Sequence, residues 1–422
     1  MQVVVMTFIL AIGSLALPGT SLDSASAADL RAPFDFETTA VLPKGVRNPR
    51  FKDLILFMDE KYGDTGGIEP LGGKLNKTIT WQDVIDGQEN DFKKAKVEGV
   101  LRDLNFGNDE AAGASTGVVN TYANVKVPVF AMGVTEKLTM AVAVPVVDVQ
   151  VNADTGLIKS AQGEAFVKSI CETDPAECNR AAQKLNDAVN TKLKRLGYEP
   201  IKSERISNIG DVKVVGKYRV VENRDDAVTF KSELTLPTGT PPNANKALDV
   251  PTGDGQADIG AMVIYDRFLD EPHRFRANLY AGYTAQLPDE IDRRIPESET
   301  ELLSRDVERV DRDLGDSVSS GAALTYELPF GLNFGAAYGF QYMTPASYRG
   351  SKFQPHRYSL LSRDTRQMLH SATFGLGFST VEMYRAKETP VPFQLNLAYC
   401  KPFAGYNVVK NDFVAVEVVL FF

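Results

Sequence analysis

The sequence predicts an all-β protein, an antiparallel transmembrane β-barrel of about 12 strands (about 10 to 14) with one helical extracellular loop. Three observations lead to this fold class. Stretches of about 10 to 15 residues alternate apolar and polar side chains. Tight turns and long polar loops alternate between these stretches. The final stretch ends on an aromatic residue, Phe422.

The final stretch, Phe413–Phe422, shows the alternation most clearly. Val414, Val416 and Val418 share one face with Leu420 and Phe422, and the opposite face carries Glu417. About ten residues suffice for a tilted strand to cross a bilayer. The stretch resembles the terminal strand of bacterial outer-membrane barrels, and this resemblance implies that Phe422 is the insertion signal read by the barrel-insertion machinery. A buried strand of a soluble protein is the alternative for this segment alone.

The same alternation recurs along the chain. We expect strands near residues 45–58, 116–133, 136–150, 209–222, 226–237, 255–267, 273–286, 316–328, 331–344, 371–384, 391–403 and 413–422. Strands of soluble antiparallel sandwiches also alternate, but they average about five or six residues. The greater length here favours a membrane barrel.

The connections provide a second test. We expect tight turns near residues 134–135, 223–224, 271–272, 329–330 and 387–388, and long loops at 152–208, 238–254, 287–315, 345–370 and 404–412. Outer-membrane barrels place short turns in the periplasm and long loops outside. Lys94–Phe106 could be a further strand, but it would make the strand number odd, so we assign it to the first outer loop.

The N-terminal residues predict export. Residues 1–27 combine an apolar core with the site Ala25-Ser-Ala27, which is typical of a secretory signal peptide, and residues 28–422 then form the barrel. No apolar run of about 18 residues follows that could form a membrane helix. We therefore expect the outer membrane of a Gram-negative bacterium, with outer-membrane lipid as a partner. The formal net charge of −9 gives no support for nucleic-acid binding.

Two outer loops carry features of their own. The loop at 152–208 contains a predicted helix at 181–196 that ends at Gly197, either packed on the rim or acting as a lid over the lumen. Cys171 and Cys178 in this loop could form a disulfide, or both could be free thiols, and Cys400 is left over. The loop at 289–313 holds ten acids against five arginines. It is either a solvated face or a site that bridges lipopolysaccharide through divalent cations.

The lumen is where we expect function. Its predicted inward-facing charged residues are Asp211, Lys213, Lys217, Arg219, Lys231, Glu233, Asp258, Asp266, Arg274, Arg276, Glu327 and Glu417. They either form a salt-bridged interior that fills a narrow barrel or line a charged constriction that steers polar or anionic solutes. Met262, Ile264 and Tyr280 are too few to make an apolar inner patch.

Glycine and aspartate mark one loop near this lumen. Gly239, Gly253 and Gly255 predict a reversal with positive φ. Asp254 and Asp258 are expected to cap turns, because an EF-hand would need further ligands. No metal and no cofactor is predicted.

Five short sequence segments resemble those of a known family. They are Leu42-Pro-Lys-Gly45, Pro70-Leu-Gly72, Gly133-Val-Thr-Glu-Lys-Leu-Thr-Met-Ala-Val-Ala-Val-Pro-Val146, Leu234-Thr-Leu-Pro-Thr-Gly-Thr240 and Thr252-Gly-Asp-Gly-Gln-Ala-Asp-Ile-Gly260. In this order they resemble the MetA-pathway of phenol degradation outer-membrane transporter family, distantly akin to the long-chain fatty-acid channel group. The family commonly has Tyr-Gly-Leu-Thr where this chain has Met132-Gly-Val-Thr. The resemblance implies a barrel that transports small, often aromatic compounds.

Catalysis is not expected. A barrel phospholipase needs a histidine and a serine on one face of a strand, but Ser371 points away from the face of its neighbour His370. His273 follows a turn and His356 lies in a loop. We therefore expect a channel for passive uptake of small-molecule solutes. The alternative is a structural or surface protein with a filled lumen, as a homo-oligomer or as a sheet that neighbouring subunits close.

Overall fold

The computed structural model describes residues 37–422, apart from residues 72, 74, 75, 87, 89, 174–187, 272 and 300–302. The signal peptide predicted at residues 1–27 lies outside the described residues and stays a prediction. Among the described residues, no helix is long and apolar enough to cross a membrane.

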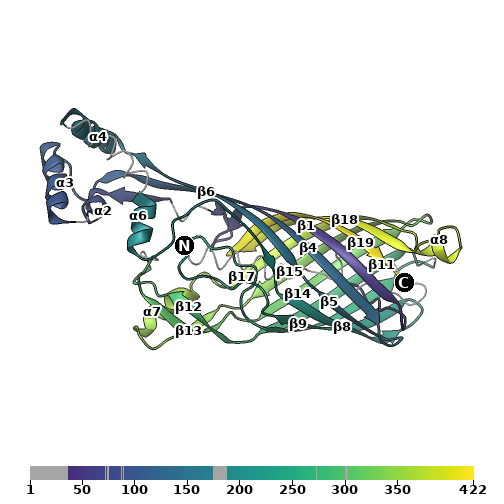
Figure 1. Ribbon diagram of the computed structural model, residues 1–422. Helices are drawn as coiled ribbons and strands as arrows, with labels where there is room; N and C mark the ends of the chain where they lie inside the picture. The colour runs from purple at the N-terminus through teal and green to yellow at the C-terminus, as the bar shows by residue number, and fades with distance from the viewer. Residues whose placement is uncertain are drawn as a thin grey trace.

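The fold is a closed antiparallel barrel of 12 strands (Figure 1). The strands are β1 (Arg47–Tyr62), β4 (Ala111–Gly133), β5 (Leu138–Ala143), β8 (Val212–Glu222), β9 (Asp226–Leu236), β10 (Asp258–Phe268), β11 (Phe275–Gln286), β14 (Ser317–Glu327), β15 (Leu332–Met343), β17 (Gln367–Ser379), β18 (Phe393–Tyr406) and β19 (Val408–Leu420). Strand β1 pairs with β4 on one side and with β19 on the other. The sheet therefore closes within one chain, and the alternative of an open sheet completed by neighbouring subunits is wrong.

The side chains of the barrel strands face outward and inward as the alternation in the sequence predicted. In β15 and β18, Phe334, Leu395 and Leu397 are exposed, whereas Asn333 and Asn396 are buried. In β19, Val416 and Val418 are exposed, and Phe413, Ala415 and Val419 are buried. Apolar side chains thus cover the outside of the barrel, which is the pattern of a wall that faces lipid.

The chain ends meet where the barrel closes. Phe422 exchanges two backbone hydrogen bonds with Arg47 at the start of β1, at 2.9 and 3.0 Å. The same end of the barrel carries the short turns, among them residues 134–137 and 223–225. We call it the periplasmic end, because barrels of this type place their short turns there.

One connection differs from the expectation, and another agrees with it. The long loop predicted at 404–412 is wrong, because β18 and β19 are joined by the single residue Asn407, which has φ +50°. Residues 94–106 lie in the first outer loop, as assigned, and form most of helix α3 (Asp91–Asp103). The prediction failed because residues 404–412 have the polar composition of a loop, although they belong to the ends of β18 and β19.

Some strands extend far past the barrel into an arm (Figure 1). β4 continues alongside β6 (Val146–Lys159), whose first half pairs with β7 (Glu204–Ile209). β3 (Lys77–Thr80), α2 (Trp81–Asp86), α3 and α4 (Ala161–Thr173) complete the arm around a small core of Trp81, Ile85, Leu101 and Phe166. A short β2 (Ile68–Pro70) pairs with the outer end of β1.

The predicted helix at 181–196 is found in part. Helix α6 (Ala188–Arg195) is followed by Gly197 at φ +80°, as expected, and residues 181–187 lie outside the described residues. Leu193 and Tyr198 pack on Ile201 and Ala247 of the outer loops, so the described part of the helix lies on the rim.

The acidic stretch at 289–313 includes a folded hairpin, on which Glu290, Asp292 and Asp311 are exposed to solvent, and a role in bridging lipopolysaccharide stays a prediction. β12 (Asp289–Arg294), β13 (Val307–Asp313) and β16 (Ser347–Arg349) form a second sheet, over which α7 (Pro355–Ser362) packs. Arg294 donates to the carbonyls of Leu196, Gly197, Ala244 and Ser304, which ties this sheet to α6. At the periplasmic end, α8 (Val381–Arg385) fills the turn between β17 and β18.

The facing of β18 predicts the effect of a charge on each side of the wall. Leu397→Arg places a guanidinium on the lipid face and should lower the free energy of unfolding by roughly 2–4 kcal/mol. Asn396→Arg, one position away, should cost much less, because the Asn396 side chain already donates to the Glu417 carboxylate in the lumen at 3.0 Å. Denaturant unfolding in lipid vesicles measures both. Equal costs at the two positions would contradict the facing.

Candidate functional site in the barrel lumen

A short N-terminal segment occupies the barrel lumen. Residues 37–42, hereafter the lumen segment, precede β1 and are all buried. The sequence analysis did not find this feature, since Glu-Thr-Thr-Ala-Val-Leu has neither a motif nor a period that distinguishes it from a linker. The partners of the segment are side chains on the inner faces of β5 and β8–β11.

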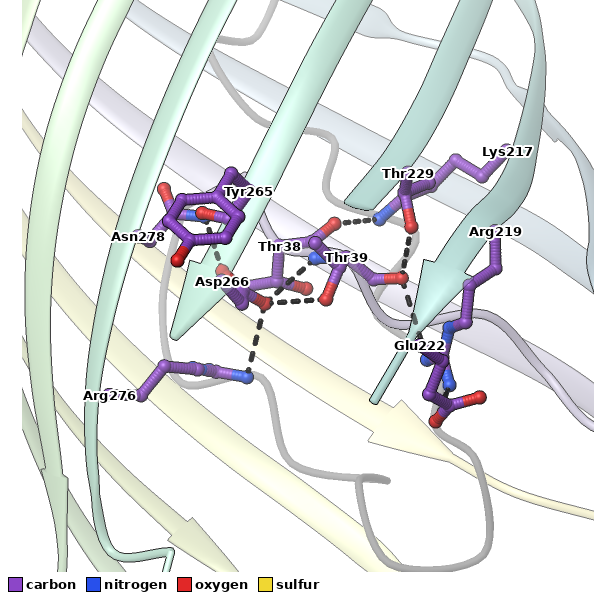
Figure 2. Close-up of polar contacts among 10 residues, drawn as sticks. All are labelled: Thr38, Thr39, Lys217, Arg219, Glu222, Thr229, Tyr265, Asp266, Arg276 and Asn278. Atoms are coloured by element: carbon purple, nitrogen blue, oxygen red, sulfur yellow. Dashed lines mark hydrogen bonds and ion pairs between the residues drawn. The ribbon is translucent and has the colours of Figure 1, made fainter. Parts of the chain in front are cut away.

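The centre of this contact is Asp266 on β10 (Figure 2). Its Oδ2 accepts hydrogen bonds from the backbone N–H of Thr39 at 2.9 Å and from the Thr39 hydroxyl at 2.8 Å. Its Oδ1 accepts from Asn278 at 2.6 Å, and Arg276 NH1 lies 3.8 Å from Oδ2. Asp266 is 1% exposed, so these donors replace water around a buried carboxylate.

The carbonyl groups of the segment face donors from β8 and β9 (Figure 2). Lys217 Nζ donates to the Thr38 carbonyl at 2.7 Å, and the Thr229 hydroxyl donates to the Thr39 carbonyl at 2.6 Å. Arg219 reaches the same Thr39 carbonyl at 3.5 Å and pairs with Glu222. Lys217 is fully buried, so its charge is satisfied inside the protein.

The ends of the segment are fixed as well. At one end, Glu37 Oε1 accepts from Lys231 Nζ at 2.6 Å. Lys231 also lies 3.6 Å from Glu233, which pairs with Lys213 at 2.6 Å. At the other end, the Leu42 N–H donates to the Thr139 hydroxyl at 2.6 Å. The segment is therefore held along its length by side chains and not by a β-ladder.

The inner face of the barrel is divided into three regions. The first is an apolar half that surrounds Leu42 and includes Leu54, Leu56, Val125, Val127, Val129, Phe413 and Ala415 of β1, β4 and β19. Such a patch was left unproven by the sequence, because Met262, Ile264 and Tyr280 alone were too few to prove one. The second is the charged wall of β8–β11 described above. The signal for the apolar half was present in the alternation of β1 and β4, where Leu54, Leu56, Val125, Val127 and Val129 fall on the inner face.

The third region, on β14, β15 and β17, is built of small residues. Two rows of inner-face residues cross these strands. One row consists of Gly321, Gly339 and Ser371, and the next row toward the periplasmic end consists of Ala323, Ala337 and Thr373. Except for Ala323, these inner-face residues are only half-buried. A Cβ on Gly321 would come within 2.5 Å of the Tyr280 ring, so this glycine lets Tyr280 lie flat on the wall.

A cavity of about 130 Å³ lies on the extracellular side of the lumen segment. Its lining combines charged groups (Glu37, Lys213, Lys231, Glu233 and Asp258), amides (Gln286, Gln341 and Gln367) and apolar side chains (Met262, Tyr280, Met343 and Leu369). Several lining residues lie at the extracellular ends of their strands, so the cavity is reached from the outer mouth.

The structure places the candidate residues of the sequence analysis in different parts of the lumen. Lys213, Lys217, Arg219, Lys231, Glu233 and Arg276 hold the lumen segment or one another, and Asp258 lies in the cavity lining. Glu417 lies on the opposite wall, 3.8 Å from Arg50. Arg274 and Glu327 are half-buried near periplasmic turns and are not among the residues that line the cavity. Their roles in solute binding stay predictions.

Sequence reasoning also missed residues that matter here. Arg50 and Lys52 of β1 are buried inward-facing cations, and Thr139, Thr229 and Asn278 are neutral partners of the lumen segment or of Asp266. The alternation of β1 could have identified the two cations. The threonines carry no such signal, because they occur on either face of a strand.

The glycine-rich loop before β10 is confirmed in part. Only Gly255 has positive φ, at +86°. Gly239 and Gly253 permit close approach instead, since a Cβ on Gly253 would lie 2.4 Å from Asp211 Oδ1. Asp254 caps a turn by accepting from the Gln256 N–H at 2.7 Å, whereas the predicted capping by Asp258 is wrong, because Asp258 begins β10.

Cys171, His273 and His370 lie outside the barrel lumen. Cys171 is disulfide-bonded, its predicted partner Cys178 lies outside the described residues, and Cys400 is buried and outside any disulfide. His273 lies 3.1 Å from Asp225 at a periplasmic turn. His370 is on the outer face, where its Nδ1 is 2.7 Å from the Tyr338 hydroxyl. The absence of catalysis stays a prediction.

Comparison with known proteins identifies the fold. No family model and no curated protein matches the sequence. An outer-membrane channel from Pseudomonas putida F1 matches with a TM-score of 0.50 and 13% identity, over 90% of this chain and 97% of that one. A FadL homologue from Pseudomonas aeruginosa matches with a TM-score of 0.36 and 8% identity, over 98% and 97% of the two chains. At these identities the likeness concerns the fold, and the second score carries no argument.

Two conclusions follow from the barrel and this likeness. The chain is a β-barrel of the Gram-negative outer membrane, the class to which the matched channels belong. The resemblance to the phenol-degradation transporter family stays a prediction, because no family model supports it.

The anchoring of the lumen segment can be tested by hydrogen exchange. Lys217→Met keeps the length of the side chain but removes the donor to the Thr38 carbonyl, a charge-assisted bond worth about 1.5–3 kcal/mol. We expect the amides of residues 38–41 to exchange at least about tenfold faster. Lys137→Met, which removes an exposed lysine from a periplasmic turn, is the control. Unchanged protection in Lys217→Met would show that the segment does not depend on this anchor.

The loop before β10 should respond to pH through Asp211. Burial raises the pKa of Asp211 to about 6, and the Asp254 carboxylate adds to the shift, against the N–H groups of Gly239 and Asp254. Because the folded-state pKa is raised, the stabilisation is complete below about pH 4 and is lost as pH rises through about 6. Loop-opening free energies from hydrogen exchange should therefore fall between pH 4 and 6.5. Asp211→Asn should flatten this dependence, and an unaltered slope in that variant would assign it to another group.

Proposed function

We propose that this protein is an outer-membrane channel for passive uptake of small molecules that carry an apolar body, with the lumen segment as its constriction. The observation that supports it best is the half-buried inner wall of β14, β15 and β17. A filled barrel would bury these residues as completely as it buries the apolar half. Among the described residues, the lumen is therefore least filled on the side where the side chains are smallest.

The apolar part of the cavity lining bears on the class of solute. Met262, Tyr280 and Leu369 line the cavity, and burial of apolar solute area against them is favourable at about 25 cal/mol per Å². Passage also requires a site that releases its solute, and a wall of glycine, alanine and serine offers little area to hold it. The family resemblance to transporters of small aromatic compounds points to the same class.

The described part of the outer loop that contains α6 packs on the rim of the barrel. The described part of α6 packs on Ile201 and Ala247, and Arg294 ties it to the second sheet. This supports the rim interpretation of the helix over a lid inserted in the lumen. The constriction is instead the lumen segment, which lies toward the periplasmic half beside Asp266 and Arg276.

The alternative is a structural or surface protein with a filled lumen. It is favoured by one specific observation, the close packing of Leu42 within the apolar half of the lumen. In that case the lumen segment would be a permanent part of the core. Homo-oligomers and the insertion machinery as a partner stay predictions under both functions.

Conductance in a planar bilayer distinguishes the two functions. We expect wild-type protein to conduct, and Asp266→Asn to conduct more or open more often, because it weakens both bonds to Thr39. Asp225→Asn removes a carboxylate at a periplasmic turn outside the lumen and serves as the control. Silence of wild-type protein and Asp266→Asn, with folding confirmed by heat-dependent gel mobility, would favour the filled barrel.

A further inference from the structure

The cavity above the lumen segment has more hydrogen-bond acceptors than the protein satisfies. Glu37 Oε2, Asp258 Oδ1 and Gln286 Oε1 are buried and receive no hydrogen bond from the described residues. All three residues line the cavity. A buried acceptor without a donor costs about 1–3 kcal/mol. Three of them around one space indicate that a donor-bearing group completes the site.

The charges of the lining have the matching sign. Three carboxylates (Glu37, Glu233 and Asp258) face two ammonium groups (Lys213 and Lys231), a net charge of −1 when all are ionised. Both lysines are already engaged, Lys213 with Glu233 and Lys231 with Glu37 and Glu233. Asp258 forms no ion pair among the described residues. A cationic ligand can therefore pair with Asp258 without displacing either lysine.

Asp258 and Gln286 are arranged to act together. They lie directly opposite each other on β10 and β11, and Thr235 and Lys213 continue the same row onto β9 and β8. Side chains opposite each other in an antiparallel sheet are about 5 Å apart. A single cationic group can thus receive contacts from the carboxylate of Asp258 and the amide oxygen of Gln286.

The other side of the cavity is apolar and aromatic. Met262, Tyr280, Met343 and Leu369 contribute to the lining, and Tyr280 is held against the wall by the absence of a side chain at Gly321. Aromatic rings attract cations over their faces, and methionine adapts its shape to varied ligands. A ligand that fits has a charged donor at one end and an apolar body at the other.

We propose that this cavity is a binding site for an organic ammonium ion with an apolar body, held by Asp258, Gln286 and Glu37. The proposal rests on the channel function for the route by which the ligand arrives and leaves, and it narrows the solute class to amines. A cationic ligand differs from the polar or anionic solutes that the sequence suggested. The lysines that suggested anionic solutes are neutralised by Glu37 and Glu233.

Binding to the folded full-length protein in detergent tests the proposal without requiring conduction. The probes are 2-phenylethylamine, its neutral counterpart 2-phenylethanol and the anion 3-phenylpropionate, compared by isothermal titration calorimetry. We expect the amine to bind at least about tenfold more tightly than either counterpart, the factor for one charge-assisted hydrogen bond. Equal binding of amine and alcohol, or preference for the anion, would overturn the proposal.

Two variants localise the effect. Asp258→Asn keeps the shape of the side chain and should lower amine affinity about tenfold or more while leaving 2-phenylethanol unaffected. Asp109→Asn removes an exposed carboxylate from the arm and should change neither. Amine affinity that survives Asp258→Asn would contradict the assignment of this cavity.

Conductance separates this proposal from the channel function. Amine binding by a barrel that never conducts would uphold the site and reject the channel. Conduction without selective amine binding would uphold the channel and reject the site.

Discussion

The structure of the lumen depends on the buried carboxylate of Asp266. A carboxylate that is 1% exposed inside a barrel is stable only when charged and hydrogen-bonding partners surround it. Arg276 and Asn278 of the neighbouring strand supply part of this environment, and Thr39 supplies the rest through its backbone N–H and its hydroxyl. The lumen segment and the barrel wall therefore supply the donors of Asp266 together. The position of the segment follows from this shared contact.

The same reasoning explains why the cations gather on one wall. Lys217, Arg219 and Lys231 lie on β8 and β9, opposite the backbone carbonyls and the Glu37 carboxylate of the lumen segment. A strand ladder would satisfy these backbone groups without any charge. Here side chains do so instead, and the remaining wall on β14, β15 and β17 needs no polar partners. It is free to be built of glycine, alanine and serine, which leave space for a solute.

The fold could be predicted from the sequence because period-two alternation is a local property that each strand carries by itself. The inner and outer faces of β15, β18 and β19 follow directly from it, as Phe334, Asn396 and Val416 show. The lumen segment could not be predicted, because the hydrogen-bond partners that hold residues 37–42 lie on strands more than 90 positions away, and nothing in the pattern of the segment records those partners. The prediction of a long loop at 404–412 failed for a different reason. A turn of one residue, Asn407, needs only one favourable backbone conformation and no turn motif.

Division of the lumen into an apolar half, a charged wall and a wall of small residues has a consequence for selectivity. The apolar half is buried and the charged wall holds the lumen segment, so a solute of the proposed channel would pass along the wall of small residues. The constriction would then select solutes by shape, since the lumen segment is held by hydrogen bonds of fixed geometry. In the proposed amine site, electrostatic selection would take place earlier, at the outer cavity, where Asp258 forms no salt bridge among the described residues. Charge selection would thus precede size selection, and a solute would reach the constriction already oriented by its charged end.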